Sequence, residues 1–385
     1  MKWINKGHEF DEYKKIFQNE QKIIIFGAGD NGKDLYSKLG FADCVRLFID
    51  NDPAKIQNGY CGKKVVSFQN FAENDEKKST IVVAVSVQNT PQVMKQFLNM
   101  GYKEGINLFD YHIFENYYIM LYALYAWNKV YVPSISVLIT TVCNLNCKYC
   151  LNFEDLRKEK HHFDIEKIKK DIDVLFEKVD RVGLLHLTGG EPFLYPDFER
   201  LVEYIQLKYS GRYVTLGTTT NGTIIPTDTI CEQMKNADMT VYIDDYRENV
   251  KLARSNRKVV IAKLQQYAIH RIEFEVSEWI TIRRKNTISD ENKLISLVEL
   301  CDNQCKQLKD KKIYGCGFCG FAIDANVSEA SEDDYIDLNL IDDKNKAVLT
   351  EFMLLFSNKG YYSYCKKCNG FLPINMERVA VAEQV

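Results

Sequence analysis

The grouping of the cysteines constrains this chain more than any other feature. It has 12 cysteines, and three of them, Cys44, Cys61 and Cys231, stand alone, as small buried residues do. The others fall into three groups: Cys143, Cys147 and Cys150; Cys301, Cys305, Cys316 and Cys319; Cys365 and Cys368. Residues 1–22 contain no apolar run of the length that a secretory signal needs, so we expect a cytoplasmic protein. That compartment disfavours structural disulfides, so the grouped thiols are predicted to bind metal.

Length and charge limit the classes of partner. A chain of 385 residues with 46% hydrophobic residues should form two or three globular domains. The formal net charge of -3 gives no basic field, which argues against nucleic acid or an anionic membrane as a partner. Residues 117–127 are too short to cross a bilayer and predict a buried helix. We therefore expect a small-molecule substrate.

Two stretches alternate apolar strands with helical segments. Between residues 22 and 111 the pattern is that of βαβ units. A second alternation begins near Pro133, where ISVLIT, GLLHLT, YVTLGT, MTVYID and IEFEV predict five strands. The alternation fades after about Lys285. The fold class is therefore α/β, with parallel strands and helices outside them.

The first cysteine group lies on one loop, directly after the strand that ends near Thr141. Iron–sulfur clusters take thiolate ligands, ordinarily four, so three thiolates leave one iron open. A structural zinc site, with His161 or His162 as the fourth ligand, is the alternative.

The sequence Cys143-Asn-Leu-Asn-Cys147-Lys-Tyr-Cys150 resembles the radical S-adenosylmethionine (SAM) superfamily, whose motif is C-x3-C-x2-C with an aromatic residue, here Tyr149, before the third cysteine. The resemblance implies a partial (β/α)6 TIM-type barrel. It also implies a [4Fe-4S] cluster whose open iron binds SAM, which is cleaved to a 5'-deoxyadenosyl radical that removes hydrogen from the substrate.

Three later motifs fit that resemblance. Gly189, Gly190 and Glu191 match the GGE motif, in which exposed backbone and a carboxylate are expected to accept the SAM ammonium. Thr219 and Asn221 lie at the end of the third strand, where the family contacts the SAM ribose and carboxylate. The fourth strand ends in two acids that are candidates for contact with ribose or substrate, although surface acids are commoner. These are Asp244 and Asp245.

The other two cysteine groups resemble the twitch or SPASM appendage of radical SAM enzymes, which holds an auxiliary [4Fe-4S] cluster. The ligands expected from this resemblance are Cys305, Cys316, Cys365 and Cys368. Cys301 and Cys319 are then surplus and remain possible ligands, and Cys319 is also a candidate hydrogen-atom donor to a product radical. On spacing alone, Cys316 with Cys319 and Cys365 with Cys368 would equally suit zinc.

A glycine-rich turn follows the first strand. Gly27, Gly29 and Gly32 precede a helix, and Asp50 ends the next strand, as in dinucleotide-binding folds. The residues FIDNDP, from Phe48 to Pro53, resemble Rossmann-like domains of surface-polysaccharide and nucleotide-sugar enzymes. A bound nucleotide and a purely scaffolding domain both remain open.

The predicted domains are a Rossmann-like domain (1–111), a helical connector (112–132), a radical SAM barrel (133–285) and an auxiliary-cluster domain (286–385). The resemblance implies oxidation or epimerisation of a sugar, cyclitol or nucleotide sugar, with an electron donor such as flavodoxin or ferredoxin. Peptide modification, as in the maturation of ribosomal peptides, is the enzymatic alternative. A zinc-bearing binding or scaffold protein is the alternative from another class.

Overall fold

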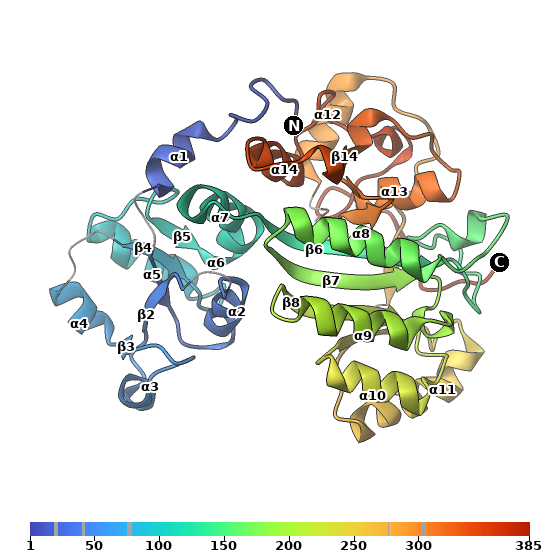
Figure 1. Ribbon diagram of the computed structural model, residues 1–385, viewed down its shortest axis with the longest axis horizontal. Helices are drawn as coiled ribbons and strands as arrows, with labels where there is room; N and C mark the ends of the chain where they lie inside the picture. Colours follow the sequence, from blue (N-terminus) through green and yellow to red (C-terminus); the bar gives the residue numbers. More distant parts are fainter. Residues whose placement is uncertain (19–21, 41–42, 75–78, 276, 302, 304) are drawn as a thin grey trace. The chain divides into compact units, whose positions relative to one another are not determined.

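The computed structural model describes residues 1–18, 22–40, 43–74, 79–275, 277–301, 303 and 305–385 (Figure 1). The chain forms two compact units: residues 10–133, and residues 134–385 together with residues 1–9. This division places residues 112–132 with the N-terminal sheet, and it does not separate residues 133–285 from residues 286–385. Among the described residues, no helix is both long and apolar enough to cross a membrane.

The first unit contains a five-stranded sheet in the order β3-β2-β1-β4-β5, and every pairing in it is parallel. That order is the one expected of a Rossmann-like half. Its strands are short runs of buried β-branched and aromatic residues, as in a sheet covered on both faces. Its elements are α1 (Asp11–Phe17), β1 (Ile23–Phe26), α2 (Asp30–Lys38), β2 (Val45–Ile49), α3 (Pro53–Asn58), β3 (Val65–Val66), α4 (Phe68–Glu73), β4 (Thr80–Val83), α5 (Thr90–Asn99), β5 (Leu108–Asp110), α6 (Tyr111–Ile113), the π-helix η1 (Phe114–Tyr118) and α7 (Ile119–Trp127). Helix α7 confirms the predicted buried helix.

The second unit is built on an eight-stranded sheet, in the order β10-β9-β8-β7-β6-β12-β13-β14. Its first half consists of β6 (Tyr131–Thr140), η2 (Glu154–Leu156), α8 (Ile165–Lys178), β7 (Arg181–Gly189), η3 (Pro192–Leu194), α9 (Phe198–Tyr209), β8 (Tyr213–Thr220), α10 (Asp228–Asn236), β9 (Thr240–Asp244), α11 (Lys251–Gln266), β10 (His270–Phe274) and β11 (Glu278–Ile280). Its second half consists of α12 (Glu291–Leu300), β12 (Gln307–Lys309), β13 (Lys312–Tyr314), α13 (Gly317–Asp324), η4 (Glu332–Asp334), β14 (Tyr335–Asp337), η5 (Leu338–Leu340), α14 (Lys346–Met353), η6 (Ser363–Lys367) and β15 (Arg378–Ala380).

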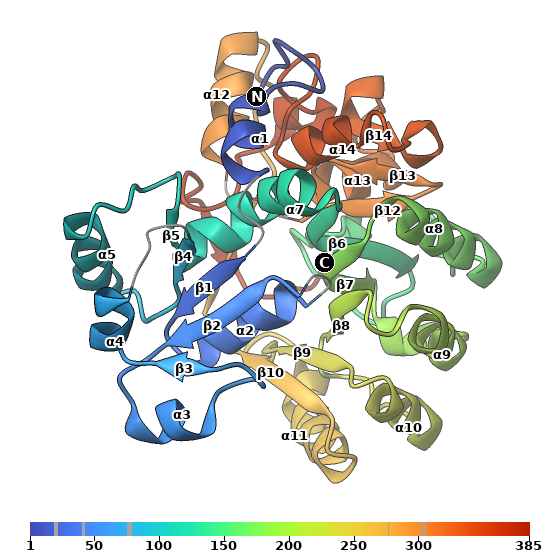
Figure 2. The ribbon, with the colours of Figure 1, turned by 60° about the vertical axis from the view of Figure 1, so that its left-hand side comes forward.

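Strands β6 to β10 lie next to one another in chain order, and the helices between them lie along one side of the sheet (Figure 2). All five predicted strands are confirmed. Within the described part of the chain, the next strand, β11, pairs antiparallel with β15 instead of adding a sixth strand beside β10. The short strand β12 joins the opposite edge, where it pairs parallel with β6. Of the expected (β/α)6 barrel, the described residues thus form four strand–helix units, β6–α8 to β9–α11, and a fifth strand, β10.

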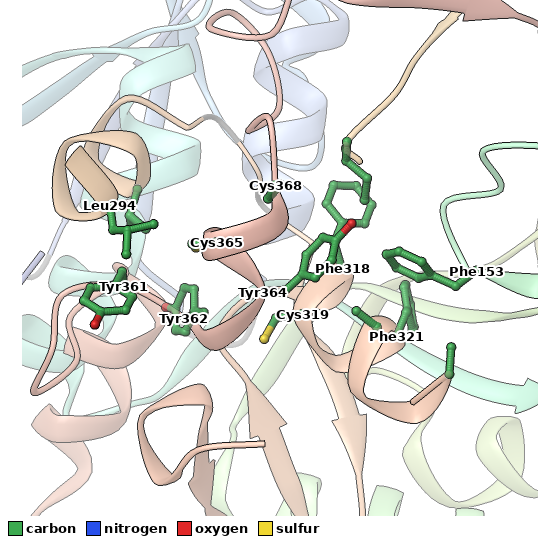
Figure 3. Packing of buried hydrophobic residues seen from close by; sticks show 14 of the residues in the cluster. Phe153, Leu294, Phe318, Cys319, Phe321, Tyr361, Tyr362, Tyr364, Cys365 and Cys368 are labelled. Atoms are coloured by element: carbon green, nitrogen blue, oxygen red, sulfur yellow. The ribbon is translucent and has the colours of Figure 1, made fainter. Parts of the chain in front are cut away.

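The core of the C-terminal half contains aromatic residues and cysteines (Figure 3). Phe153, which follows the first cysteine loop, packs edge-on against Tyr364 of η6 at a centroid distance of 5.2 Å. Cys319 of α13 and Cys365 of η6 belong to the same buried cluster. Because these side chains are buried together, the segments that carry the second and third cysteine groups pack against the segment that follows the first cysteine loop.

Candidate active site

The three cysteines of the first group border one cavity of about 310 Å³ at the carboxyl ends of β6 to β9. Parallel strands bring their carboxyl ends to one edge, which is why residues far apart in sequence meet there. The predicted residues that line this cavity are Cys143, Cys147, Cys150, Gly189, Gly190, Thr219, Asn221 and Asp244. Tyr149, Glu191 and Asp245 are not among the lining residues.

The two glycines of the GGE motif are required by contact with the cysteine loop. The amide of Gly190 donates to the carbonyl oxygen of Thr140 at 2.9 Å, and the amide of Glu191 donates to that of Val142 at 2.9 Å. A Cβ atom on Gly189 would lie 2.2 Å from Thr140 O, and one on Gly190 would lie 2.3 Å from Val142 O. We expected these glycines to open the backbone to SAM. The geometry shows that they also allow β7 to approach the start of the cysteine loop.

Glu191 makes contacts that the sequence did not predict. The residue is completely buried. Its Oε1 accepts from Thr220 Oγ1 at 2.8 Å, and its Oε2 accepts from the amide of Asn221 at 2.9 Å. Burial raises its pKa to about 7. Both carboxylate oxygens therefore hold the end of β8 against β7, and the predicted contact of Glu191 with the SAM ammonium stays a prediction.

Donors surround the sulfur atoms of the first group. Cys143 Sγ accepts from the amide of Leu145 at 3.5 Å and from Asn221 Nδ2 at 3.8 Å. Cys147 Sγ accepts from Gln384 Nε2 at 3.1 Å. Burial raises the pKa of Cys143 to about 12 and that of Cys150 to about 11, so these thiols need a bound cation to become thiolates. Three convergent sulfurs with N–H donors fit an iron–sulfur cluster.

The two acids at the end of β9 point to different surroundings. Asp244 borders the cavity, and its carboxylate accepts from the hydroxyl of Tyr246 at 2.9 Å. Burial raises the pKa of Asp244. Asp245 instead forms a bidentate pair with Arg247 at 2.8 and 2.5 Å, and that pairing lowers its pKa to about 2. Of the two candidates, only Asp244 is placed to contact a ligand in this cavity.

Several lining residues were missed by sequence reasoning. Leu145, Tyr246 and Trp279 form an apolar wall, and Asn152 donates through Nδ2 to the carbonyl oxygen of Gly189 at 2.5 Å. Asn152 follows Cys150 closely in sequence, which was the available signal. Trp279 had no such signal, because it lies on β11, whose position depends on pairing with β15.

Tyr149 carries the aromatic position of the motif but turns away from the cavity lining. Its backbone has a φ of 63°, a conformation that few non-glycine residues adopt. The guanidinium carbon of Arg283 lies 5.8 Å from the centroid of its ring. Tyr149 is thus placed to shape the loop, and its predicted contact with the cofactor stays a prediction.

The auxiliary cysteines border a second cavity. Its lining contains Cys301, Cys316, Cys319, Cys365 and Cys368. Three of these sulfurs accept hydrogen bonds: Cys316 from Asn303 Nδ2 at 3.1 Å, Cys301 from the amide of Phe371 at 3.3 Å, and Cys368 from the amide of Gly370 at 3.2 Å.

Cys305, one of the four preferred ligands, is not in that lining. Its Sγ lies 3.5 Å from Ser136 Oγ on β6. Cys301 and Cys319, which the sequence left as possible ligands, both line this cavity with Cys316, Cys365 and Cys368. The Cys305 sulfur thus faces β6, and it also lies against Gly317, the residue after Cys316.

Lys306 is an unusual neighbour of these thiols. The residue is only 2% exposed, and Nζ has no hydrogen-bond partner among the described residues. Burial lowers its pKa, and Cys316, Cys305 and Cys301 oppose that shift. A buried ammonium needs a counter-charge, and an anionic metal–thiolate group would provide one. In the part of the chain that is described, no three His, Cys, Asp or Glu side chains are grouped closely enough to hold a single metal ion.

The glycine turn of the first unit borders a separate cavity of about 320 Å³, lined by Gly27, Gly29, Asp50, Lys55 and Ser86 among others. Asp50 Oδ2 accepts from the amide of Ala28 at 2.9 Å and from Lys55 Nζ at 3.3 Å. Gly32 is not part of the lining. A Cβ atom there would lie 2.0 Å from Gly27 O, so Gly32 serves the packing of α2 on the turn.

Comparisons with known proteins agree on the second unit. Residues 137–264 match the radical SAM superfamily. GTP 3',8-cyclase of Chlorobaculum tepidum is 33% identical over 94 residues, which cover 24% of this chain and 27% of the cyclase. The antilisterial bacteriocin subtilosin biosynthesis protein AlbA of Bacillus subtilis is 31% identical over 87 residues, covering 23% of this chain and 18% of AlbA. The match thus spans less than a third of the length of either relative. Among solved structures, BtrN in complex with AdoMet and 2-DOIA aligns with 62% of this chain and 93% of its own, at 15% identity and a TM-score of 0.39.

Proposed function

From a radical SAM domain at residues 137–264, we propose that this chain is an enzyme that holds a [4Fe-4S] cluster on Cys143, Cys147 and Cys150 and binds SAM beside it. One observation carries the proposal: three thiols of a single loop border the same cavity as the backbone of Gly189 and Gly190. Three thiolates leave one iron for the cofactor. When bound, the cluster and SAM would supply a 5'-deoxyadenosyl radical.

The side chains of the cavity suit containment of a reactive species. Tyr246 and Trp279 provide an apolar wall, with ring centroids 5.3 Å apart in an edge-on contact. Asn221 Nδ2 donates to both Cys143 Sγ and Asn144 Oδ1, at 3.8 and 3.2 Å, and so fixes the start of the cysteine loop. Exclusion of water protects a radical from side reactions.

We propose that the substrate is a sugar, cyclitol or nucleotide sugar that is oxidised or epimerised. Asp244 and Thr219 supply hydrogen-bonding groups beside the aromatic wall, a combination that suits a hydroxyl-rich ligand. The relative from Chlorobaculum tepidum is named for a reaction of GTP, which supports a nucleotide-bearing substrate. The reaction would take place in the cytoplasm, with flavodoxin or ferredoxin as the electron donor.

An auxiliary [4Fe-4S] cluster would be held by Cys301, Cys316, Cys365 and Cys368. The N–H donors to three of these sulfurs and the buried ammonium of Lys306 support an anionic group there. Such a cluster would anchor the fold near the substrate or accept an electron from it. The cavity at Gly27, Gly29 and Asp50 would bind a nucleotide.

Peptide modification is the second candidate. The similarity to AlbA, whose name assigns it to the biosynthesis of a bacteriocin, favours it. The first unit favours a nucleotide sugar over a peptide as the substrate, because its sheet order and glycine turn are those of a nucleotide-binding domain.

The test begins with anaerobically reconstituted protein. Iron and labile sulfide are measured, and the protein is incubated with SAM, reductant and a panel of nucleotide sugars while release of 5'-deoxyadenosine is followed. The Cys150→Ala variant is the control and should release none. Near-stoichiometric zinc without labile sulfide would contradict the enzyme proposal and favour a zinc-bearing scaffold.

The same reaction run in deuterated water separates the two outcomes for a substrate that reacts. Epimerisation should place solvent deuterium on the inverted carbon. Oxidation should consume SAM in step with product and leave the product free of deuterium at the oxidised carbon. A precursor peptide as the sole substrate that stimulates 5'-deoxyadenosine release would favour the second candidate.

A further inference from the structure

Residues 378–385, here called the strap, run from β15 across the first cysteine loop. Strand β15 pairs antiparallel with β11, with Glu278 opposite Ala380. The next two residues of the strap, Val381 and Ala382, are 2% and 0% exposed. They pack in one hydrophobic cluster with Leu145 and Cys147. The strap is therefore anchored to β11 at one end and to the first cysteine loop at the other.

Two further hydrogen bonds bind the strap to the loop itself, and a third binds it to Asn249, which lies outside the loop. The amide of Lys148 donates to the carbonyl oxygen of Glu383 at 2.6 Å, and the amide of Val385 donates to that of Asn146 at 3.0 Å. Asn249 Nδ2 donates to Val381 O at 2.6 Å. The bonds of Asn146 and Lys148 come from the residues on either side of Cys147, so they fix the backbone that carries its sulfur.

The side-chain amide of Gln384 meets Cys147 directly. Its Nε2 donates to Cys147 Sγ at 3.1 Å and to Ala382 O at 2.7 Å, while its Oε1 accepts from the amide of Asn146 at 2.9 Å. Exchanging the oxygen and nitrogen of this amide would set oxygen against the sulfur and against a carbonyl. The network thus selects the orientation that presents N–H to the sulfur.

We propose that Gln384 is a positioning residue of the SAM-binding cluster, which holds the Cys147 sulfur and favours the reduced cluster through its N–H···S hydrogen bond. The inference rests on the proposed cluster at Cys143, Cys147 and Cys150. Reduction adds negative charge to the sulfurs, and a donor to a sulfur stabilises that charge, which is one way in which proteins set the reduction potential of a cluster. Gln384 does not line the cavity, so it acts through Cys147 and not on the substrate.

Two variants test the role of the donor in the full-length holoprotein. Gln384→Met keeps the length of the side chain and removes donor and acceptor. Gln384→Glu keeps an acceptor for the amide of Asn146, and it replaces the donor by a carboxylate oxygen, which adds a negative charge beside the sulfur. The control is Glu383→Gln on the same strap, because the Glu383 side chain forms an exposed pair with Lys148 at 3.5 Å and touches no sulfur.

The readout is electron paramagnetic resonance at a fixed solution potential. Only the part of the cluster signal that changes when SAM is added is compared between variants. In both Gln384 variants the ratio of reduced to oxidised cluster should fall by about tenfold, the size of effect of one hydrogen bond to a charged group. Glu383→Gln should match the unmodified protein. Iron per chain is measured in parallel.

The outcomes separate this inference from the proposed function. Full iron loading with an unchanged ratio in both Gln384 variants would overturn the inference and leave the cluster intact. Loss of iron from both variants would overturn the tuning role and leave only a structural one. A SAM-insensitive signal in the unmodified protein would remove the proposed function, and this inference with it.

Discussion

At the scale of single residues, close backbone approach decides the shape of the cysteine loop. The motif Gly189-Gly190-Glu191 does two structural things: the glycines let β7 contact the loop, and Glu191 fastens β8 to β7. Side chains of any other type at the glycines would collide with carbonyl oxygens of Thr140 and Val142. Cofactor binding at this motif therefore depends on backbone geometry before it depends on any charge.

The variant Gly190→Ala tests this directly. Its Cβ atom would lie 2.3 Å from Val142 O, so the loop has to move. We expect a loss of about 1–3 kcal/mol in the free energy of unfolding and poor iron loading of the first cluster, measured by denaturant titration and iron analysis. Gly29→Ala is the control, since nothing lies within 4 Å of its Cβ position. Wild-type iron content in Gly190→Ala would contradict this account.

The cysteine assignment gives a second prediction at this scale. Cys301→Ser should remove the auxiliary cluster, because Cys301 lines that cavity, and iron per chain should fall from about eight to about four. Cys305→Ser should keep the iron, because the Cys305 sulfur lies against Ser136 instead. Iron and sulfide analysis of the two purified variants decides between the sets. Equal iron content in the two variants would contradict the assignment of Cys301 over Cys305.

At the scale of elements, capping and periodicity account for the helices that cover the sheet. In α8, Ile165, Ile168, Ile172 and Leu175 repeat at helical spacing and are buried. The Asp164 side chain accepts from the amides of Glu166 and Lys167, at 2.9 and 3.0 Å. The start of this helix is thus specified by local residues, which is why it was predictable.

The cap of α8 is open to a quantitative test. Asp164→Ala should cost about 1 kcal/mol, because two helix N–H groups lose their acceptor. The matched control is Asp197→Ala at the corresponding position of α9, where the side chain makes no cap hydrogen bond and removal should cost less than about 0.5 kcal/mol. The midpoints of urea unfolding, followed by circular dichroism, compare the two. An equal effect of both variants would remove the capping argument.

At the scale of the whole molecule, the two compact units differ in how metal would affect them. All nine grouped cysteines lie in the unit formed by residues 1–9 and 134–385. Binding free energy at a metal site that the unfolded chain lacks becomes folding free energy. The unit formed by residues 10–133, which contains the Rossmann-like sheet, should gain no stability from metal binding.

Removal of iron by an oxidant and a chelator should therefore lower the temperature of one thermal unfolding transition and leave that of the other unchanged. Differential scanning calorimetry of the holoprotein and the metal-free protein should show a fall of several degrees or more in the transition of the cysteine-bearing unit. The transition of residues 10–133 should stay within error of its original temperature. A fall of both transitions by the same amount would show that the units do not respond separately.

The sequence by itself determined what depends on neighbours along the chain. The alternation of apolar runs predicted the strands from β1 to β10, and the spacing of Cys143, Cys147 and Cys150 predicted a three-thiol loop, because strand burial and loop length are local properties. The resemblance to radical SAM motifs placed Gly189, Gly190, Thr219 and Asn221 at the same site, and they line one cavity with this loop because the ends of parallel strands share an edge.

Only the tertiary structure decided what depends on distant segments meeting. It placed Cys301 and not Cys305 in the lining of the auxiliary cavity, buried Glu191 between two strands, and paired β11 with β15 rather than with β10. It also brought Gln384 to Cys147, 237 residues away in the chain. Spacing along a sequence carries no information on which way a side chain turns once two remote segments pack, and that choice is made by burial and by hydrogen bonds satisfied together.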